Sequence, residues 1–230
     1  MPDTKRSYGG ILDPATHVER TYGPGWEVIL QNEVLDFASY TSAWFGGHNT
    51  CTITTLTAVF SHHAKTALPG IESDPKELYR IIEGIGRRRR YYLRAFGTLP
   101  FFIDDLARAT WRHFGYDGTA HTTYFLFDDS SLAPLLMDEI DAGRPGAISF
   151  THGSYAKHTV TFHGYRIFER GRDLRAYLLV NDNWRLDRRW VDLTDIAGIG
   201  GSFIGVTRIT PPVFAPDRLG REGRDIHLSI

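Results

Sequence analysis

The stretch that decides the fold is residues 158–184, HTVTFHGYRIFERGRDLRAYLLVNDNW. It contains two runs rich in β-branched, aromatic and aliphatic residues, 158–168 and 176–180, and such runs are typical of β-strands. The polar segment 169–175 between them predicts the turn of an antiparallel hairpin. Two further runs have the same β-rich character and complete a predicted antiparallel sheet: 147–150 and 203–209.

The first half of the chain has the pattern of helices. Cys51 is followed by apolar residues at helical spacing, and Asn49 or Thr50 could provide the N-cap oxygen. Asp74-Pro75 is a helix start, a capping residue before a proline at the first helical position, and Glu77 completes a capping box. We expect two more helices, over 101–114 and 132–142. Helices first and an antiparallel sheet second predict an α+β protein.

The length of 230 residues suits a single domain. Glycine, proline and polar residues dominate both ends, so we expect an irregular arm at the start and a surface tail at the end. The predicted organisation is one domain, 1–230, in four parts: an arm over 1–25, a mainly helical lobe over 26–143, a sheet lobe over 144–210 and a tail over 211–230.

Composition excludes several classes of function. The formal net charge of -1 gives no basic field, so we expect no nucleic-acid partner. A membrane-spanning helix needs about 18 consecutive apolar residues, and no such run occurs, so we expect no membrane insertion. The chain starts without a secretory signal and has one cysteine, which cannot form an internal disulfide. These features favour a cytoplasmic protein.

Cys51 is the candidate nucleophile. A thiol attacks as the thiolate, and the first turn of a helix lowers a thiol pKa because its unpaired N–H groups and macrodipole favour negative charge. Cys51 has this position, after a polar loop with two glycines and before an apolar helix face. The alternative is a small buried cysteine that only fills space. The position indicates chemistry only if a base and an orienting group lie nearby.

His158 is the candidate base and Asp182 its candidate orienting group. His158 begins a strand, so Val160 and Phe162 behind it would anchor the ring in the core and leave its tip exposed. Asp182 ends the next strand, where its carboxylate could accept a hydrogen bond from the far imidazole nitrogen. A structural histidine and a turn-capping aspartate are the alternatives.

These residues resemble the papain-like cysteine peptidases, close to the double-glycine leader peptidases of bacteriocin exporters and their free-standing relatives. Cys51 opens a helix, His158 is followed by Gly164-Tyr165 at the family's spacing, and Asp182 precedes Trp184 by two. Residues 140–145, ending in Gly-Arg-Pro, also match the family's approach to its first sheet strand. The resemblance covers roughly 45–70 and 135–190.

The resemblance implies a two-lobe papain-like fold, with the cysteine-bearing helix packed on the sheet lobe and the site between the lobes. It implies a thiol hydrolase that cleaves an amide, peptide or thioester bond through an acyl-enzyme on Cys51. The substrate would be a peptide or an acylated small molecule or carrier. Two alternatives stay open: an acyltransferase of bacterial secondary metabolism with the same triad, and a non-catalytic papain-like module that binds a peptide.

The residues expected to donate hydrogen bonds to the oxyanion differ from those of the family. Phe45 stands six residues before the cysteine, where the family has a glutamine, and Thr52 replaces the glycine that follows the cysteine in the leader-peptidase branch. Donors to the oxyanion could instead be the Cys51 backbone N–H with the side chain of Asn49 or Gln31. Trp184 is a further candidate for substrate binding.

Other chemistry-bearing residues give weaker signals. The ten histidines lack a His-Glu-x-x-His motif or paired cysteines, so we expect no metal site and no cofactor. The run Arg87–Arg90 is typical of a solvated helix face, with anion binding as the alternative. The glycine-rich segment 198–201 lacks the Lys-Ser/Thr of a phosphate-binding loop.

Overall fold

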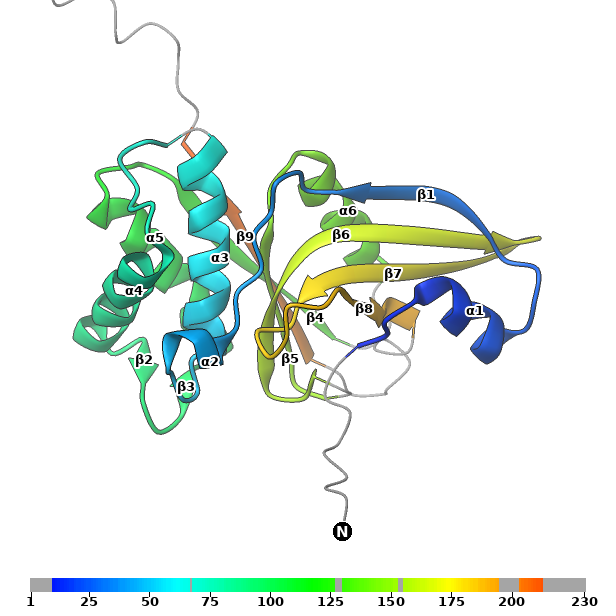
Figure 1. Ribbon diagram of the computed structural model, residues 1–230, viewed down its shortest axis with the longest axis horizontal. Coiled ribbons are helices and arrows are strands. Elements are labelled where there is room, and N and C mark those ends of the chain that lie inside the picture. The colour runs from blue at the N-terminus through cyan, green and yellow to red at the C-terminus, as the bar shows by residue number, and fades with distance from the viewer. Residues whose placement is uncertain (1–9, 67, 127–129, 153–154, 195–202, 213–230) are drawn as a thin grey trace, which may run out of the picture.

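The predicted hairpin forms the centre of the sheet. β6 (His158–Arg170) and β7 (Asp173–Asn181) are antiparallel, with Thr161 opposite Asn181 at the end far from the turn. The structure is a computed structural model that describes residues 10–66, 68–126, 130–152, 155–194 and 203–212 (Figure 1). Its described part combines helices with an antiparallel sheet, so the predicted α+β class is confirmed.

Five more strands join this hairpin in one antiparallel sheet. The strand order is β4-β9-β5-β6-β7-β8, and β1 pairs with the far half of β6, beyond the segment that pairs with β5. A separate two-stranded hairpin lies beside the helices (Figure 1). The remaining strands are β1 (Glu27–Glu33), β2 (Tyr92–Leu93), β3 (Gly97–Thr98), β4 (Thr119–Leu126), β5 (Gly146–Phe150), β8 (Arg189–Asp192) and β9 (Phe203–Thr210).

Helices cover both faces of the sheet. α3 packs on β5 and β6, and α5 packs on β4 and β9, while α6 packs on β1 and β6. Adjacent residues of β5 show that these are opposite faces, because Ala147 joins the core under α3 and Ile148 joins the core under α6. The helices are α1 (Pro14–Tyr22), α2 (Ser42–Phe45), α3 (Cys51–Thr66), α4 (Pro75–Arg89), α5 (Ile103–His113) and α6 (Leu132–Asp141), with a 3₁₀ turn at Pro100–Phe102.

The predicted starts of two helices agree with the structure. α3 begins at Cys51, and α4 begins at Pro75 with the Asp74 carboxylate accepting from the N–H groups of Lys76 and Glu77. The capping residue and the proline fix this start as the sequence pattern predicted.

The predicted division into parts needs two corrections. The expected irregular arm contains α1, because Asp13 caps the helix, Pro14 starts it and Val18 packs into a core with Tyr177 and Trp190. The expected helical lobe contains β1 and β4, which both belong to the large sheet. β1 gave no alternating pattern because nearly all of its side chains are exposed. Most of the predicted tail lies outside the described residues.

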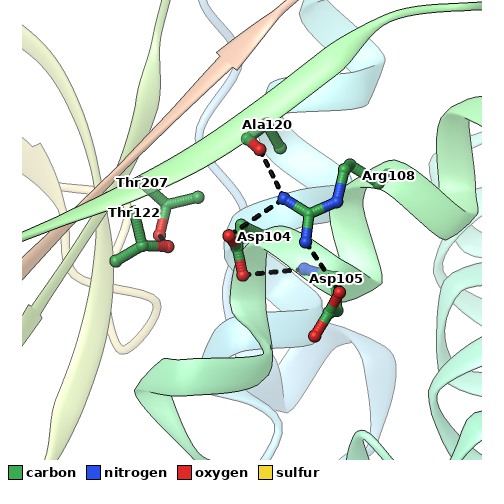
Figure 2. A network of polar contacts seen from close by, with 6 residues as sticks. All are labelled: Asp104, Asp105, Arg108, Ala120, Thr122 and Thr207. Carbon is green, nitrogen blue, oxygen red and sulfur yellow. Dashed lines mark hydrogen bonds and ion pairs between the residues drawn. The ribbon is translucent and has the colours of Figure 1, made fainter.

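Arg108 fastens α5 to the sheet (Figure 2). Its guanidinium donates to the backbone carbonyl of Ala120 on β4 at 2.6 Å and to the carboxylates of Asp104 and Asp105 at 3.0 and 2.7 Å. The carboxylates lie three and four residues earlier on the same helix, so they hold the guanidinium toward the strand. This contact fixes the helix that supports β4 and β9.

Two buried histidines make stability depend on pH. Burial lowers the pKa of His63 to about 3, and burial together with the charge of Arg188 lowers the pKa of His163 to about 3. The unfolded chain binds a proton at each imidazole below about pH 6.5, while the folded protein stays neutral there. Stability therefore falls as the pH drops from about 6.5 toward 3.

We predict that the free energy of unfolding falls by about 1.4 kcal/mol for each of these histidines between about pH 7.5 and pH 5.5. Urea unfolding at the two pH values measures this. His163→Phe keeps the ring stack on Phe37 and should lose its own share of the pH dependence, about 1.4 kcal/mol, whereas replacement of the exposed His121 by Gln should leave the pH dependence unchanged. If the free energy of unfolding of His163→Phe falls between the two pH values as much as that of the wild type, His163 does not contribute to the pH dependence.

Candidate active site

Cys51 is the first residue of α3 and faces the start of β6. The first helical hydrogen bond runs from the Thr54 N–H to the carbonyl of Thr50, so the N–H of Cys51 precedes the regular ladder. The loop before it uses left-handed backbone at Gly46 and at Asn49, which has a φ of 55°. Cys51 as a residue is only partly buried.

Buried hydroxyl groups fix the first turns of α3 on the sheet. The Thr52 hydroxyl donates to the Thr159 hydroxyl at 3.2 Å, and the Ser149 hydroxyl lies 2.9 Å from the same oxygen. The Asn183 amide nitrogen donates to the Cys51 carbonyl at 3.1 Å, to the Thr159 carbonyl at 2.9 Å and to the Thr55 hydroxyl at 2.9 Å. Since these groups are shielded from water, each contact constrains where the thiol stands relative to β6.

The structure places the side chain of His158 close enough to Cys51 for the imidazole to lower the pKa of the thiol. The Nε2 atom of His158 lies 2.7 Å from the backbone carbonyl oxygen of Asp182. A carbonyl only accepts, so Nε2 carries a proton, and in the neutral ring Nδ1 is the unprotonated nitrogen. The nitrogen left for the thiol is therefore the one able to take its proton.

The environment of Cys51 favours the thiolate. Burial raises the pKa of the thiol, but the hydrogen bond and the charge of His158 lower it more, and the N–H groups of Thr159 and Thr52 add to this effect. The resulting pKa is about 7, compared with 9.0 for an unperturbed thiol. A large fraction of Cys51 is thus ionised at neutral pH.

Asp182 holds His158 through its backbone and not, as the sequence suggested, through its carboxylate. One carboxylate oxygen accepts from the N–H groups of Trp184 and Arg185, at 2.9 and 3.0 Å. This oxygen, Oδ1, is therefore occupied in closing the turn after β7, while Oδ2 is buried and has no hydrogen-bond partner among the described residues. That turn presents the Asp182 carbonyl to the imidazole, so the side chain orients His158 indirectly.

Trp184 covers the imidazole. The Trp184 and His158 rings are stacked with centroids 4.0 Å apart and planes 12° from parallel, and Tyr155 stacks on Trp184 at 5.5 Å. His158 is 8% exposed, so its tip is buried and not open to solvent as the strand pattern predicted. The indole thus shields the His158–Asp182 hydrogen bond from water, which strengthens it.

The two side chains proposed for the oxyanion lie elsewhere. Asn49 donates its amide N–H groups to the carbonyls of Arg94 and Ala95 in the β2–β3 turn, at 3.3 and 3.1 Å. Gln31 is opposite Arg166 and accepts from its Nε atom at 3.1 Å. That position is eight residues along β6 from His158, which corresponds to about 26 Å of strand. Both amides are therefore excluded from the oxyanion position.

Asn183 and Tyr155 are site residues that the sequence reasoning missed. Asn183 has a φ of 64°, and its buried amide joins α3 to β6. The tolerance of asparagine for left-handed backbone was a usable signal in the run 181–183. Tyr155 precedes His158 by three residues and gave no pattern that distinguished it from a core aromatic residue.

Comparisons with known proteins give no relative: the sequence matches no protein-family model and no curated protein. Among the described residues, no helix is long and apolar enough to cross a membrane. The same part of the chain contains no group of three or more His, Cys, Asp or Glu side chains that could hold a metal ion.

We predict that His158→Ala raises the pKa of Cys51 from about 7 toward or beyond the 9.0 of an unperturbed thiol, because burial is then opposed only by the N–H groups of Thr159 and Thr52. The rate of alkylation by iodoacetamide at neutral pH should fall at least about tenfold, since little thiolate remains. The single cysteine makes mass spectrometry a direct readout. A rate equal to that of the wild type would contradict the pairing.

A second prediction concerns Asp182. Asp182→Asn keeps a side-chain oxygen that can accept from Trp184 and Arg185, so the alkylation rate should stay within about twofold of the wild type. Asp182→Ala opens the turn, and the rate should fall at least about tenfold. If both variants lose reactivity equally, the carboxylate acts on His158 by its charge and the backbone explanation is wrong.

Proposed function

We propose that this protein is a papain-like thiol hydrolase that cleaves an amide, peptide or thioester bond through an acyl-enzyme on Cys51. The observation that carries the proposal is the effect of His158 on the Cys51 thiol, whose pKa it lowers to about 7. The chain order of cysteine at the start of a helix, histidine at a strand start and aspartate directly after the next strand supports a papain-like arrangement. A thiol that only filled space would have no need of a low pKa.

Acylation begins when Nδ1 of His158 takes the thiol proton. The sulfur lone pair forms a bond to the substrate carbonyl carbon, and the carbonyl π electrons move to oxygen. When they return, the bond to the leaving nitrogen or sulfur breaks, and the leaving group takes the proton from Nδ1. The Asp182 carbonyl keeps Nε2 protonated throughout, so Nδ1 does all of the proton transfer.

Deacylation reverses these roles with water. Nδ1 accepts a proton from a water molecule, whose oxygen attacks the thioester carbonyl carbon. The carbon–sulfur bond breaks, the acid departs and the sulfur is again the proton partner of His158. The same imidazole position therefore serves both half-reactions.

The N-terminus of α3 is the available oxyanion donor. The N–H of Cys51 belongs to the first turn, where backbone donors and the macrodipole favour negative charge. The missing side-chain amide costs on the order of 3 kcal/mol of transition-state stabilisation. We therefore expect slow turnover and an acyl-enzyme that persists long enough to detect.

Intact-protein mass spectrometry tests the proposal. We predict that the wild type incubated with an acyl thioester of N-acetylcysteamine gains one acyl group on Cys51, and that the group is lost in buffer. Cys51→Ala should gain none, and His158→Ala should be acylated at least about tenfold more slowly because its thiol is protonated.

Two results would contradict the hydrolase. If Cys51 reacts rapidly with iodoacetamide but forms no adduct with thioesters or peptides, the thiol is activated without acyl chemistry. If the adduct is stable in buffer and leaves only when an amine is added, the acceptor is an amine and the protein is an acyltransferase.

A further inference from the structure

A polar pocket lies against the loop that leads to Cys51. It has a volume of about 220 Å³, and its walls are one face of α4, the glycine loop 46–48 and the β2–β3 hairpin. Tyr79, Glu83 and Arg87 follow one another at four-residue intervals, so they share that face of α4. Drug-sized ligands occupy roughly 300–1,000 Å³, so this pocket suits one group of a substrate and not a whole ligand.

The pocket has one positive charge beyond its internal ion pair. The Arg87 guanidinium donates to the Glu83 carboxylate at 2.8 Å, which balances these two residues. Arg94, from the β2–β3 hairpin, also lines the pocket and forms no ion pair with any residue that the structure describes. The lining therefore matches a single negative charge and not a dianion.

The phenols and the glycine loop shape the pocket for a hydrogen-bonding group. Burial raises the pKa of Tyr79 to about 12, and burial also raises the pKa of Tyr92, so both phenols keep their protons at neutral pH. The single proton of Tyr92 is donated to the His48 carbonyl, whereas the Tyr79 hydroxyl has no hydrogen-bond partner among the described residues. A Cβ atom on Gly47 would come within 2.3 Å of the Tyr79 hydroxyl and 2.4 Å of the Thr50 hydroxyl. The bare backbone at Gly47 is what leaves room for the phenol.

Hydrogen bonds connect the pocket to the loop before Cys51, and the pocket lies close to Cys51. The Tyr92 hydroxyl donates to the His48 carbonyl at 3.0 Å, and the Asn49 amide donates to the Arg94 carbonyl. His48 precedes Cys51 by three residues, so their Cα atoms are at most about 11 Å apart. A substrate attached to the sulfur can therefore extend a short chain into the pocket.

We propose that this pocket is a subsite for a carboxylate carried by the substrate, held chiefly by Arg94. A carboxylate has the single charge that the lining balances, and it matches the fork of guanidinium donors. The subsite rests on the proposed function in that its ligand is part of the molecule that acylates Cys51. It also gives a role to one arginine of the basic run at the end of α4, since Arg87 pairs with Glu83 and lines the pocket while its three neighbours in the run do not.

Thiol-labelling kinetics test the subsite without requiring acyl transfer. The probes are 4-maleimidobutyric acid and its primary amide, which differ only in the charge at the end of a short chain. In each, the Cys51 sulfur adds to the maleimide double bond and a proton completes the neighbouring carbon. The rate constants for Cys51 modification are followed by mass spectrometry on the wild type, Arg94→Met and Arg89→Met. Arg89 is exposed on α4 outside the pocket, so its variant removes the same charge without touching the subsite.

We expect the acid to modify wild-type Cys51 about tenfold faster than the amide, a ratio that falls to about one in Arg94→Met and persists in Arg89→Met. Equal rates for acid and amide on the wild type would overturn the subsite, as would an equal loss in both variants. If the acid and the amide react at equal rates but thioesters still acylate Cys51, the subsite is wrong and the hydrolase proposal is unaffected. If the acid reacts faster than the amide but no thioester or peptide acylates Cys51, the pocket binds a carboxylate and the hydrolase proposal is wrong.

Discussion

The hydrogen bond from His158 Nε2 to the Asp182 carbonyl is the constraint on which the site depends. It joins the first residue of β6 to the first residue after β7, so the hairpin register sets the place of the imidazole. A carbonyl acceptor permits only one neutral tautomer, and this leaves Nδ1 for Cys51. The position of one backbone oxygen therefore determines the direction of proton transfer.

The second requirement is a rigid junction between α3 and the sheet. Apolar packing would hold the helix but leave its rotation and register weakly defined, whereas directional hydrogen bonds fix both. Threonine hydroxyls from α3 and β6 meet there, and Asn183 connects the two elements with a single buried amide. The polar interface is costly if any partner is lost, because an unpaired buried donor costs about 1–3 kcal/mol. Stability and thiol placement are thus coupled at the same residues.

The central elements were predictable from local patterns, and the contacts between them were not. The 158–184 hairpin, the start of α3 and the capped start of α4 each have a strong local signal, and all three agree with the structure. β1 has exposed side chains on both faces and joins the sheet mainly through backbone pairing with β6, so its sequence lacks alternation. Asn49 and Gln31 were plausible by residue type, but their amides are used by a turn and by Arg166. Whether an amide side chain can reach the oxyanion depends on its position in the tertiary structure, which the local sequence does not determine.

The central claim is that His158 keeps a partly buried thiol ionised near neutral pH. The most direct measurement is a pH titration of the ultraviolet absorbance of the Cys51 thiolate, with Cys51→Ser as the blank that removes the tyrosine signal. The structure predicts a midpoint of about 7. A midpoint at or above 9.0, the value of an unperturbed thiol, would show that His158 does not stabilise the thiolate and would contradict the whole account of the site.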